Sequence, residues 1–128
     1  MLFRSHESAA RVRRAQELVA AAPHEGALLG IGPVAEALIA GRVRELFLSD
    51  ILPAAQEAWA CRACRSFAAG APAPVCPVCG RSELQPVSLR EELAAQALAH
   101  GAGVRFVEAR AVPAFDAQGG VGAFTRYP

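Results

Sequence analysis

Four cysteines stand in two close pairs, and this spacing limits what the middle of the chain can form. The pairs are Cys61-Arg-Ala-Cys64 and Cys76-Pro-Val-Cys79-Gly80, with eleven residues between them. Two residues between cysteines allow each pair to form a tight turn that directs both sulfurs at one metal ion. Four thiolates around Zn²⁺ make a closed tetrahedral site, which is typical of structural rather than catalytic zinc. The sequence therefore predicts a zinc ribbon with Cys61, Cys64, Cys76 and Cys79 as ligands.

The spacing alone leaves two disulfides or four free thiols as alternatives to a metal. The residues that follow Met1 to Arg4 are charged and helical in pattern, so no leader for export is expected and we expect a cytoplasmic protein. Disulfides are rare in that compartment. A thioredoxin-type redox pair would explain only one of the two motifs. Zinc is therefore the predicted cofactor, and we expect Trp59 and Phe67 to cover its site on one side.

Chain length and charge narrow the class of protein. The 128 residues fit one domain, and we treat 1–128 as a single domain. No apolar stretch reaches about 18 residues without a charge, so a membrane-spanning helix is not expected. Thirteen basic and twelve acidic residues give a formal charge of +1, whereas proteins that bind nucleic acid mainly through charge are usually far more basic. Direct contact with RNA is therefore allowed but not favoured.

Helical and strand-like segments alternate on both sides of the cysteines. Periodicity and capping residues predict helices over 5–22, 33–40 and 88–100, and short apolar runs predict strands over 27–31, 43–48, 104–108 and 121–127. Ser5 and Ser88 are the expected N-caps, and Pro33 is the expected first helical residue. The residues expected to face the core from the second and third helices include Val34, Leu38, Ile39, Leu89, Leu93, Ala97 and Leu98. This alternation implies an α/β layer fold with helices against a small sheet.

The pattern breaks in the stretch that contains the cysteines, which we interpret as a zinc-ribbon insertion over 55–85. The stretch is rich in Pro, Gly and Ala and has almost no apolar core of its own. Metal binding can supply on the order of 10 kcal/mol to such small modules. We therefore expect the Cys76→Ser substitution to unfold the insertion while the α/β body survives.

The remaining polar residues offer no catalytic set. His6, His24 and His100 are far apart in the sequence, and none has a partner at catalytic spacing. The basic residues Arg11, Arg13 and Arg14 are typical of a solvated helix face. The glycine-rich segment 118–122 lacks the Lys-Ser/Thr of a phosphate-binding loop. We therefore expect no enzyme.

Four segments, together with the cysteine pairs, resemble one protein family in their order and spacing. They are Gly30-Ile-Gly-Pro-Val-Ala-Glu-Ala-Leu38, Gly41-Arg-Val-Arg-Glu-Leu-Phe-Leu-Ser-Asp50, His100-Gly-Ala-Gly-Val104 and Gly119-Gly-Val-Gly-Ala-Phe-Thr-Arg-Tyr127. Over roughly residues 10 to 127, the chain resembles the C-terminal domain of the archaeal and eukaryotic class 1 peptide-chain release factors and Pelota, and more closely that of their bacterial relatives.

This resemblance implies a three-layer α/β/α sandwich with a small mixed sheet, related to ribosomal proteins that bind kinked RNA, with zinc-binding cysteines at this insertion in some members. It also implies docking onto a translational GTPase, a ribosome-recycling ATPase or the ribosome. In the family, a separate domain carries a Gly-Gly-Gln loop that releases the peptide. Gln118-Gly119-Gly120 has a different order, so no catalytic residue is carried over. We expect either an excised domain, with the rest of a longer release-factor-like protein as a partner, or a stand-alone remnant of such a protein.

The functional hypothesis is thus a non-catalytic interaction domain of a translation protein acting in termination or ribosome rescue. Arg62, Arg65 and Arg81, which flank the cysteines, are the candidate partner-binding residues. The alternative is a stand-alone RNA-binding protein of the kink-turn-binding fold. Those relatives use an Asn-Glu…Lys type of signature, and this chain contains neither Asn nor Lys.

Overall fold

The computed structural model describes residues 2–21, 26–50, 52, 57–108, 110–117 and 119–126, and their side chains from residue 9 onward. Its elements, in chain order, are α1 (Leu2–Ala21), β1 (Ala27–Leu29), α2 (Ile31–Ile39), β2 (Val43–Ser49), β3 (Glu57–Cys61), β4 (Phe67–Ala69), β5 (Leu84–Ser88), α3 (Leu89–Ala99), β6 (Gly103–Val107), α4 (Pro113–Ala117) and β7 (Val121–Thr125). The predicted α/β class is confirmed.

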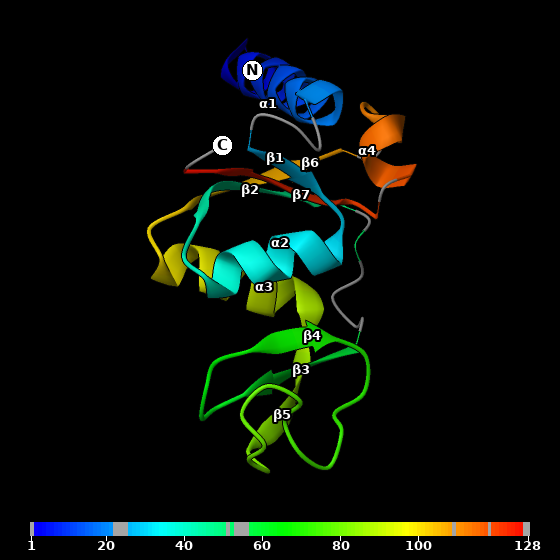
Figure 1. Ribbon diagram of the computed structural model, residues 1–128. Helices are drawn as coiled ribbons and strands as arrows, with labels where there is room; N and C mark the ends of the chain where they lie inside the picture. Colours follow the sequence, from blue (N-terminus) through cyan, green and yellow to red (C-terminus); the bar gives the residue numbers. More distant parts are fainter. Residues whose placement is uncertain are drawn as a thin grey trace.

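Two separate sheets organise the described residues. The larger has the strand order β1-β7-β2-β6 and is mixed, because β2 and β6 run parallel while β7 is antiparallel to both of its neighbours. Figure 1 shows α1 and α4 on one face of this sheet and α2 and α3 on the other. The smaller sheet, β4-β3-β5, lies beyond α2 and α3. We call residues 57–88, which contain this sheet and all four cysteines, the ribbon, and the remainder the body.

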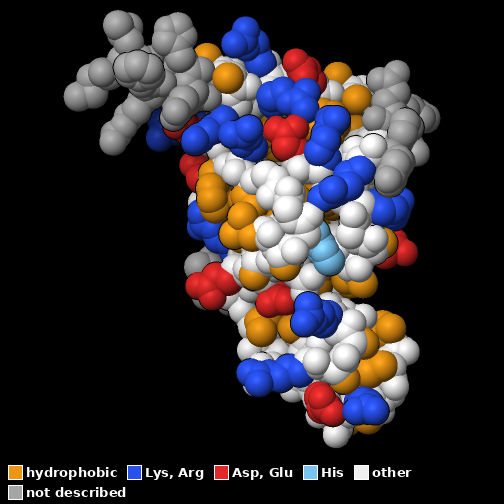
Figure 2. Space-filling model, turned by 90° about the vertical axis from the view of Figure 1, so that its left-hand side faces the viewer, with side chains coloured by type: hydrophobic (Ala, Val, Ile, Leu, Met, Phe, Trp, Pro, Cys, Tyr) orange, Lys and Arg blue, Asp and Glu red, His pale blue; other side chains and the backbone are white. Residues whose placement is uncertain are grey.

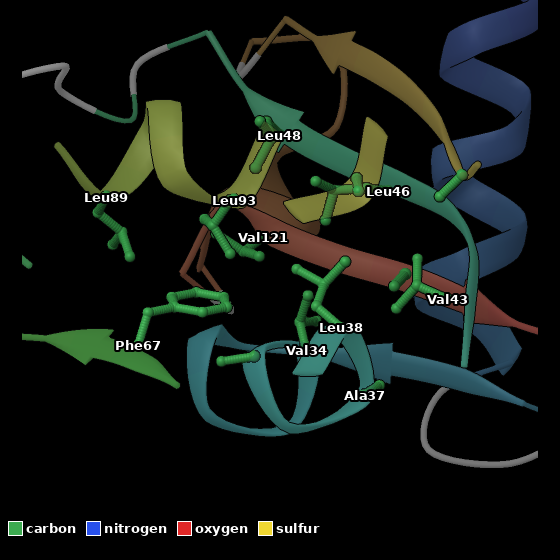
Figure 3. Packing of buried hydrophobic residues seen from close by; sticks show 14 of the residues in the cluster. Val34, Ala37, Leu38, Val43, Leu46, Leu48, Phe67, Leu89, Leu93 and Val121 are labelled. Carbon is green, nitrogen blue, oxygen red and sulfur yellow. The ribbon is translucent and has the colours of Figure 1, made fainter. Parts of the chain in front are cut away.

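The side chains of β2 alternate between two apolar clusters, as a strand buried on both faces must. Leu46 and Leu48 point into the cluster formed with α2 and α3, whereas Phe47 points into the cluster under α1 and α4. All three side chains are fully buried. Figure 3 shows the first cluster, in which Phe67 of β4 joins residues from the body.

The N-cap prediction for α3 is confirmed, because Ser88 Oγ accepts a hydrogen bond from the backbone N–H of Glu91 at 3.5 Å. Two other helix starts differ from expectation. The first helix begins at Leu2, so Ser5 lies inside it, and α2 begins at Ile31 with Gly30 as its N-cap, so Pro33 is its third residue.

Two apolar residues expected in the core are instead exposed. Ile39 is 39% and Leu98 is 67% exposed. Each directly follows the last buried residue of its helix, which is Leu38 in α2 and Ala97 in α3. One step along a helix turns the side chain by about 100°, which points Ile39 and Leu98 away from the buried stripe. The short helix α4 was not predicted. The strands agree with the predicted ranges to within two residues where the structure describes them.

Gly122, in the middle of β7, allows α1 to approach the sheet closely. A methyl group at this position would lie 2.6 Å from Leu18 Cδ2 and 3.1 Å from both Leu29 Cδ2 and Phe115 Cε1. We therefore expect Gly122→Ala to lower the free energy of unfolding by about 1–3 kcal/mol through overpacking.

Gly32→Ala is the matched control, because no residue other than its chain neighbours lies within 4 Å of its added methyl. Gly32 is exposed at the start of α2 and directly precedes Pro33, so the gain in helix propensity is opposed by crowding against the proline ring. We therefore expect this change to alter the free energy of unfolding by less than about 1 kcal/mol. Chemical denaturation of both variants is the measurement, and equal effects would contradict the packing argument.

No helix among the described residues is long and apolar enough to cross a membrane.

Candidate metal centre

The four cysteine sulfurs converge at one end of the ribbon. All four Sγ atoms lie within 4.8 Å of one another. Cys61 Sγ is 3.6 Å from Cys79 Sγ, and Cys64 Sγ is 3.7 Å from Cys76 Sγ, so the short distances join one pair of cysteines to the other. A disulfide requires about 2.0 Å between sulfurs, and all four cysteines are free. Four sulfurs at about 2.3 Å from a tetrahedral Zn²⁺ would be about 3.8 Å apart, which these distances match closely.

The two Cys-x-x-Cys turns have the same backbone hydrogen bonds. In the first, the N–H of Arg65 donates to Cys61 O at 2.9 Å, and the N–H of Cys61 donates to Ser66 O at 2.8 Å. In the second, the N–H of Gly80 donates to Cys76 O at 2.9 Å, and the N–H of Cys76 donates to Arg81 O at 2.7 Å. This repeated geometry aims both pairs of sulfurs at the same point.

The residue after each turn has a left-handed backbone. Its φ angle is 65° at Arg65 and 78° at Gly80. Glycine adopts this conformation without a steric penalty, whereas a side chain makes it costly. Arg65 is the only non-glycine residue with positive φ among the described residues. The sequence predicted the role of Gly80 but gave no sign that Arg65 takes up the same conformation.

The ionisation of the thiols favours a cation at this point. Hydrogen bonds with Ser66, from its side chain first and then its backbone, lower the pKa of Cys64 to about 6. For Cys79, a backbone hydrogen bond from Arg81 acts to lower the pKa, but desolvation and hydrogen bonds with the other three cysteines outweigh it and raise the pKa to about 11. The cluster therefore resists full ionisation on its own, because neighbouring negative charges disfavour each other. A divalent metal removes that penalty and holds its thiol ligands deprotonated.

The smaller sheet has one face toward the cysteines and the other toward the body. Trp59 and Leu84 pack with the buried Cys61 and Cys76, so the prediction that Trp59 covers the site is confirmed. The prediction for Phe67 is wrong. Its side chain belongs to the core shared with α2 and α3, because neighbouring residues of a strand point to opposite faces and Ala68 takes the place beside the cysteines.

The donor set fits zinc: four thiolates, a tetrahedral spacing and two equivalent turns. We expect purified protein to carry one Zn²⁺ per chain, with four sulfur ligands at about 2.3 Å. Elemental analysis combined with X-ray absorption at the zinc edge measures both. A metal-free protein in which all four thiols react freely with a thiol reagent while the fold is intact would contradict the assignment.

The three candidate partner-binding arginines do not lie together. Arg62 and Arg65 line a groove between the ribbon and α3. Arg81 lies on the second turn, with its Nη1 3.6 Å from Glu83 Oε1 and its side chain 70% exposed. His100 is the C-cap of α3 and lies at the same groove. The positions of His24 and Gln118, and the side chain of His6, lie outside the described residues.

For Arg14, the prediction of a solvated helix face is wrong, because its side chain contacts residues of the main sheet. Its Nη2 lies 2.6 Å from Glu45 Oε1, and its guanidinium stacks 4.4 Å from the centre of the Phe124 ring. Arg105 Nε lies 3.5 Å from the other oxygen of the same Glu45 carboxylate. These hydrogen bonds and charges raise the pKa of Arg14, with Glu45 as the largest cause. The sequence could not reveal this network, because it joins α1, β2 and β6 across long separations.

Comparison with known proteins supports the architecture. No protein-family model matches the chain, and no curated protein sequence matches it. Among solved structures, the chain matches the C-terminal domain of Peptide Chain Release Factor from Methanosarcina mazei with a TM-score of 0.68 and 24% sequence identity. The match covers 98% of this chain and 86% of that one. The chain has the fold of that release-factor domain. The resemblance predicted from the sequence is thus confirmed at the level of the fold.

Proposed function

We propose that this chain is a non-catalytic interaction domain of a release-factor-like translation protein, acting in termination or ribosome rescue. The observation that carries the proposal is the match of 98% of the chain to a release-factor C-terminal domain. Within the described residues, the cysteines are the only cluster of three or more metal-ligating side chains, and their closed four-sulfur arrangement has no position for a substrate. A structural zinc ion therefore accounts for the four cysteines, and the proposal assigns them no catalytic role.

The finer features belong to the same proposal. The fold is a three-layer α/β/α sandwich of the kink-turn ribosomal-protein type, with the ribbon as an insertion in one domain of residues 1–128. The partner is a translational GTPase, a ribosome-recycling ATPase or the ribosome, and the domain works in the cytoplasm beside the other parts of a longer release-factor-like protein. The partner-binding surface includes Arg62, Arg65 and Arg81, which are all exposed on the ribbon.

Co-sedimentation with ribosomes and pull-down of purified translational GTPases test this proposal. We expect saturable binding that changes little between about 50 and 200 mM salt, because a protein–protein surface of mixed polarity releases few counterions. The Arg62→Ala/Arg65→Ala double variant should weaken binding while retaining zinc. A pull-down of purified ribosome-recycling ATPases completes the set of partners, and absence of binding to ribosomes, GTPases and these ATPases by the folded, zinc-loaded chain would refute the proposal.

One surface favours the alternative, direct RNA binding. The parallel strands β2 and β6 begin at the same end of the main sheet where the antiparallel β7 ends. Five arginines lie at this end, although the net charge of the whole chain is close to zero. They are Arg14, Arg42, Arg44, Arg105 and Arg126. Figure 2 shows blue side chains gathered around a red one on the upper half of this face. Three of the five are already engaged: Arg14 and Arg105 by Glu45, and Arg126 by the carbonyls of Val43 and His100.

A gel shift with a kinked RNA across a salt series separates the two functions. A protein that makes six or more phosphate contacts loses about 10³-fold in affinity between about 50 and 200 mM salt. With so many of these arginines engaged, we expect only weak RNA binding. Tight binding with that steep salt dependence, abolished by Arg42→Gln/Arg44→Gln, would establish the RNA-binding function instead.

A further inference from the structure

A groove of about 470 Å³ lies between the ribbon and α3. This volume is within the range of about 300–1,000 Å³ that ligand sites occupy. Its apolar lining comes from small side chains on both walls: Ala60 and Val87 from the ribbon, and Ala95 and Ala99 from α3. Figure 2 shows charged side chains of both signs at the waist between the body and the ribbon. The groove is thus lined by small apolar side chains and by charged ones.

Two arginines without a carboxylate partner line the ribbon side of the groove. Within the described part of the chain, neither Arg62 nor Arg65 forms an ion pair, and both side chains are exposed. The acidic residue of the groove, Glu92, accepts a hydrogen bond from Gln96 Nε2 at 3.1 Å. The same amide lies 3.3 Å from the carbonyl oxygen of Arg65, which joins α3 to the first cysteine turn. The two guanidinium groups are therefore held beside the groove with their charge unneutralised.

The positive φ angle of Arg65 indicates a functional role for its side chain. At the equivalent position of the second turn the chain has Gly80, which adopts positive φ freely. At the first turn an arginine takes the same conformation, at a steric cost of order 1–3 kcal/mol. The backbone of both Arg62 and Arg65 belongs to the first cysteine turn. Of the two, only Arg65 has a positive φ angle, which a glycine would adopt at lower cost. Strain retained at a groove is typical of a functional residue.

We propose that this groove binds an extended protein segment in which carboxylates stand next to small apolar side chains. The carboxylates pair with Arg62 and Arg65, whose planar guanidinium groups match a carboxylate in a bidentate geometry. The apolar side chains of the segment pack against the small apolar side chains that line the groove. This inference rests on the proposed function, because it names the chemistry of the partner that an interaction domain of this kind would hold.

An RNA strand fits the groove less well. No Phe, Tyr or Trp lines the groove, and His100 is its one aromatic side chain, whereas single-stranded nucleic acids gain affinity by stacking successive bases on several aromatic rings. Glu92 on the α3 wall repels a backbone with one charge per nucleotide, whereas a peptide can place its few carboxylates on the opposite, arginine-lined wall. Charge complementarity therefore favours an acidic peptide.

The test selects short random peptides displayed on phage against the full, zinc-loaded chain, with counter-selection on the Arg62→Gln/Arg65→Gly double variant. Enriched peptides are synthesised, and their affinities are measured by fluorescence anisotropy. We expect enrichment of Asp or Glu beside Ala or Val. Arg65→Gly should weaken binding at least about tenfold, as loss of a charge-assisted hydrogen bond does, and replacing the peptide's carboxylates with amides should have a similar effect.

Two further measurements separate this effect from misfolding. Arg65→Gly relieves the backbone strain, so its melting temperature and zinc content should be no lower than those of the wild type. Arg13→Ala is the matched control, because Arg13 is an exposed arginine of α1, which lies on the opposite face of the main sheet from α3, and it does not line the groove. This variant should leave peptide affinity unchanged.

The remaining outcomes show whether the groove, the proposed function or both are wrong. No enriched peptide, enrichment without carboxylates, or equal losses in Arg65→Gly and Arg13→Ala would exclude an acidic-peptide groove. Binding of an oligouridine RNA that Arg65→Gly abolishes would assign the groove to nucleic acid. If the chain binds ribosomes or GTPases but no acidic peptides, only the groove is refuted. If acidic peptides bind but ribosomes, GTPases and ribosome-recycling ATPases do not, the proposed function is refuted and the groove stands.

Discussion

Removal of the metal is expected to unfold the ribbon while the sheet β1-β7-β2-β6 remains folded. The region around the cysteines buries only Trp59, Cys61 and Cys76 beside three partly buried neighbours. Such a small cluster does not offset the conformational entropy of ordering the long turns between β3, β4 and β5. Metal coordination supplies on the order of 10 kcal/mol to modules of this kind. Chelation of zinc, or the Cys76→Ser substitution, should therefore cost most of the ribbon's stability.

Hydrogen exchange followed by mass spectrometry measures this effect segment by segment. Peptides from residues 57–88 should lose protection by several orders of magnitude, while peptides from β2, β6 and β7 stay protected. Val75→Ser is the matched control, because Val75 precedes Cys76 but is 51% exposed. This variant should retain zinc and protection. Simultaneous loss of protection along the whole chain in Cys76→Ser would mean that the ribbon and body form one cooperative unit.

Local features were predictable from the sequence because their causes lie within a few residues. The spacing of the cysteines determines that each pair forms a turn, and both turns adopt the same hydrogen-bond pattern. Ser88 caps α3 through a contact with Glu91, three residues away. The strand ranges followed from short apolar runs. The overall fold was also predictable, because the order and spacing of four segments resemble a release-factor domain. The structural match, which covers 98% of the chain, agrees with that prediction.

Features that depend on long-range packing were not predictable. The groove exists because α3 packs against the ribbon, and its arginines become neighbours only through the first cysteine turn. The arginines at the end of the main sheet gather because β2 and β6 run parallel while β7 is antiparallel. The direction of Phe67 depends on which face of β4 lies against the body. A strand of three residues has no pattern long enough to indicate this.

Phe67 joins the ribbon to the body, and its removal should destabilise both. The side chain is 3% exposed and packs in the cluster that contains Leu38 and Leu93. Figure 3 shows its ring pointing from β4 into the space between α2 and α3. We expect Phe67→Ala to reduce the free energy of unfolding by about 3–5 kcal/mol, because it removes a buried aromatic ring and leaves a cavity that a rigid helix pair cannot close.

Phe106→Ala provides the matched comparison for this prediction. Phe106 is also a strand phenylalanine, but it is 43% exposed, with the Arg90 guanidinium 5.0 Å from its ring centre. Its loss removes little burial and one cation–π contact of about 0.5–1 kcal/mol. Denaturant unfolding of the zinc-loaded proteins, monitored by circular dichroism, measures both changes. If Phe67→Ala costs no more than Phe106→Ala, the ring does not link the two parts, and the ribbon is anchored to the body through the Gln96–Arg65 contact at the first cysteine turn instead.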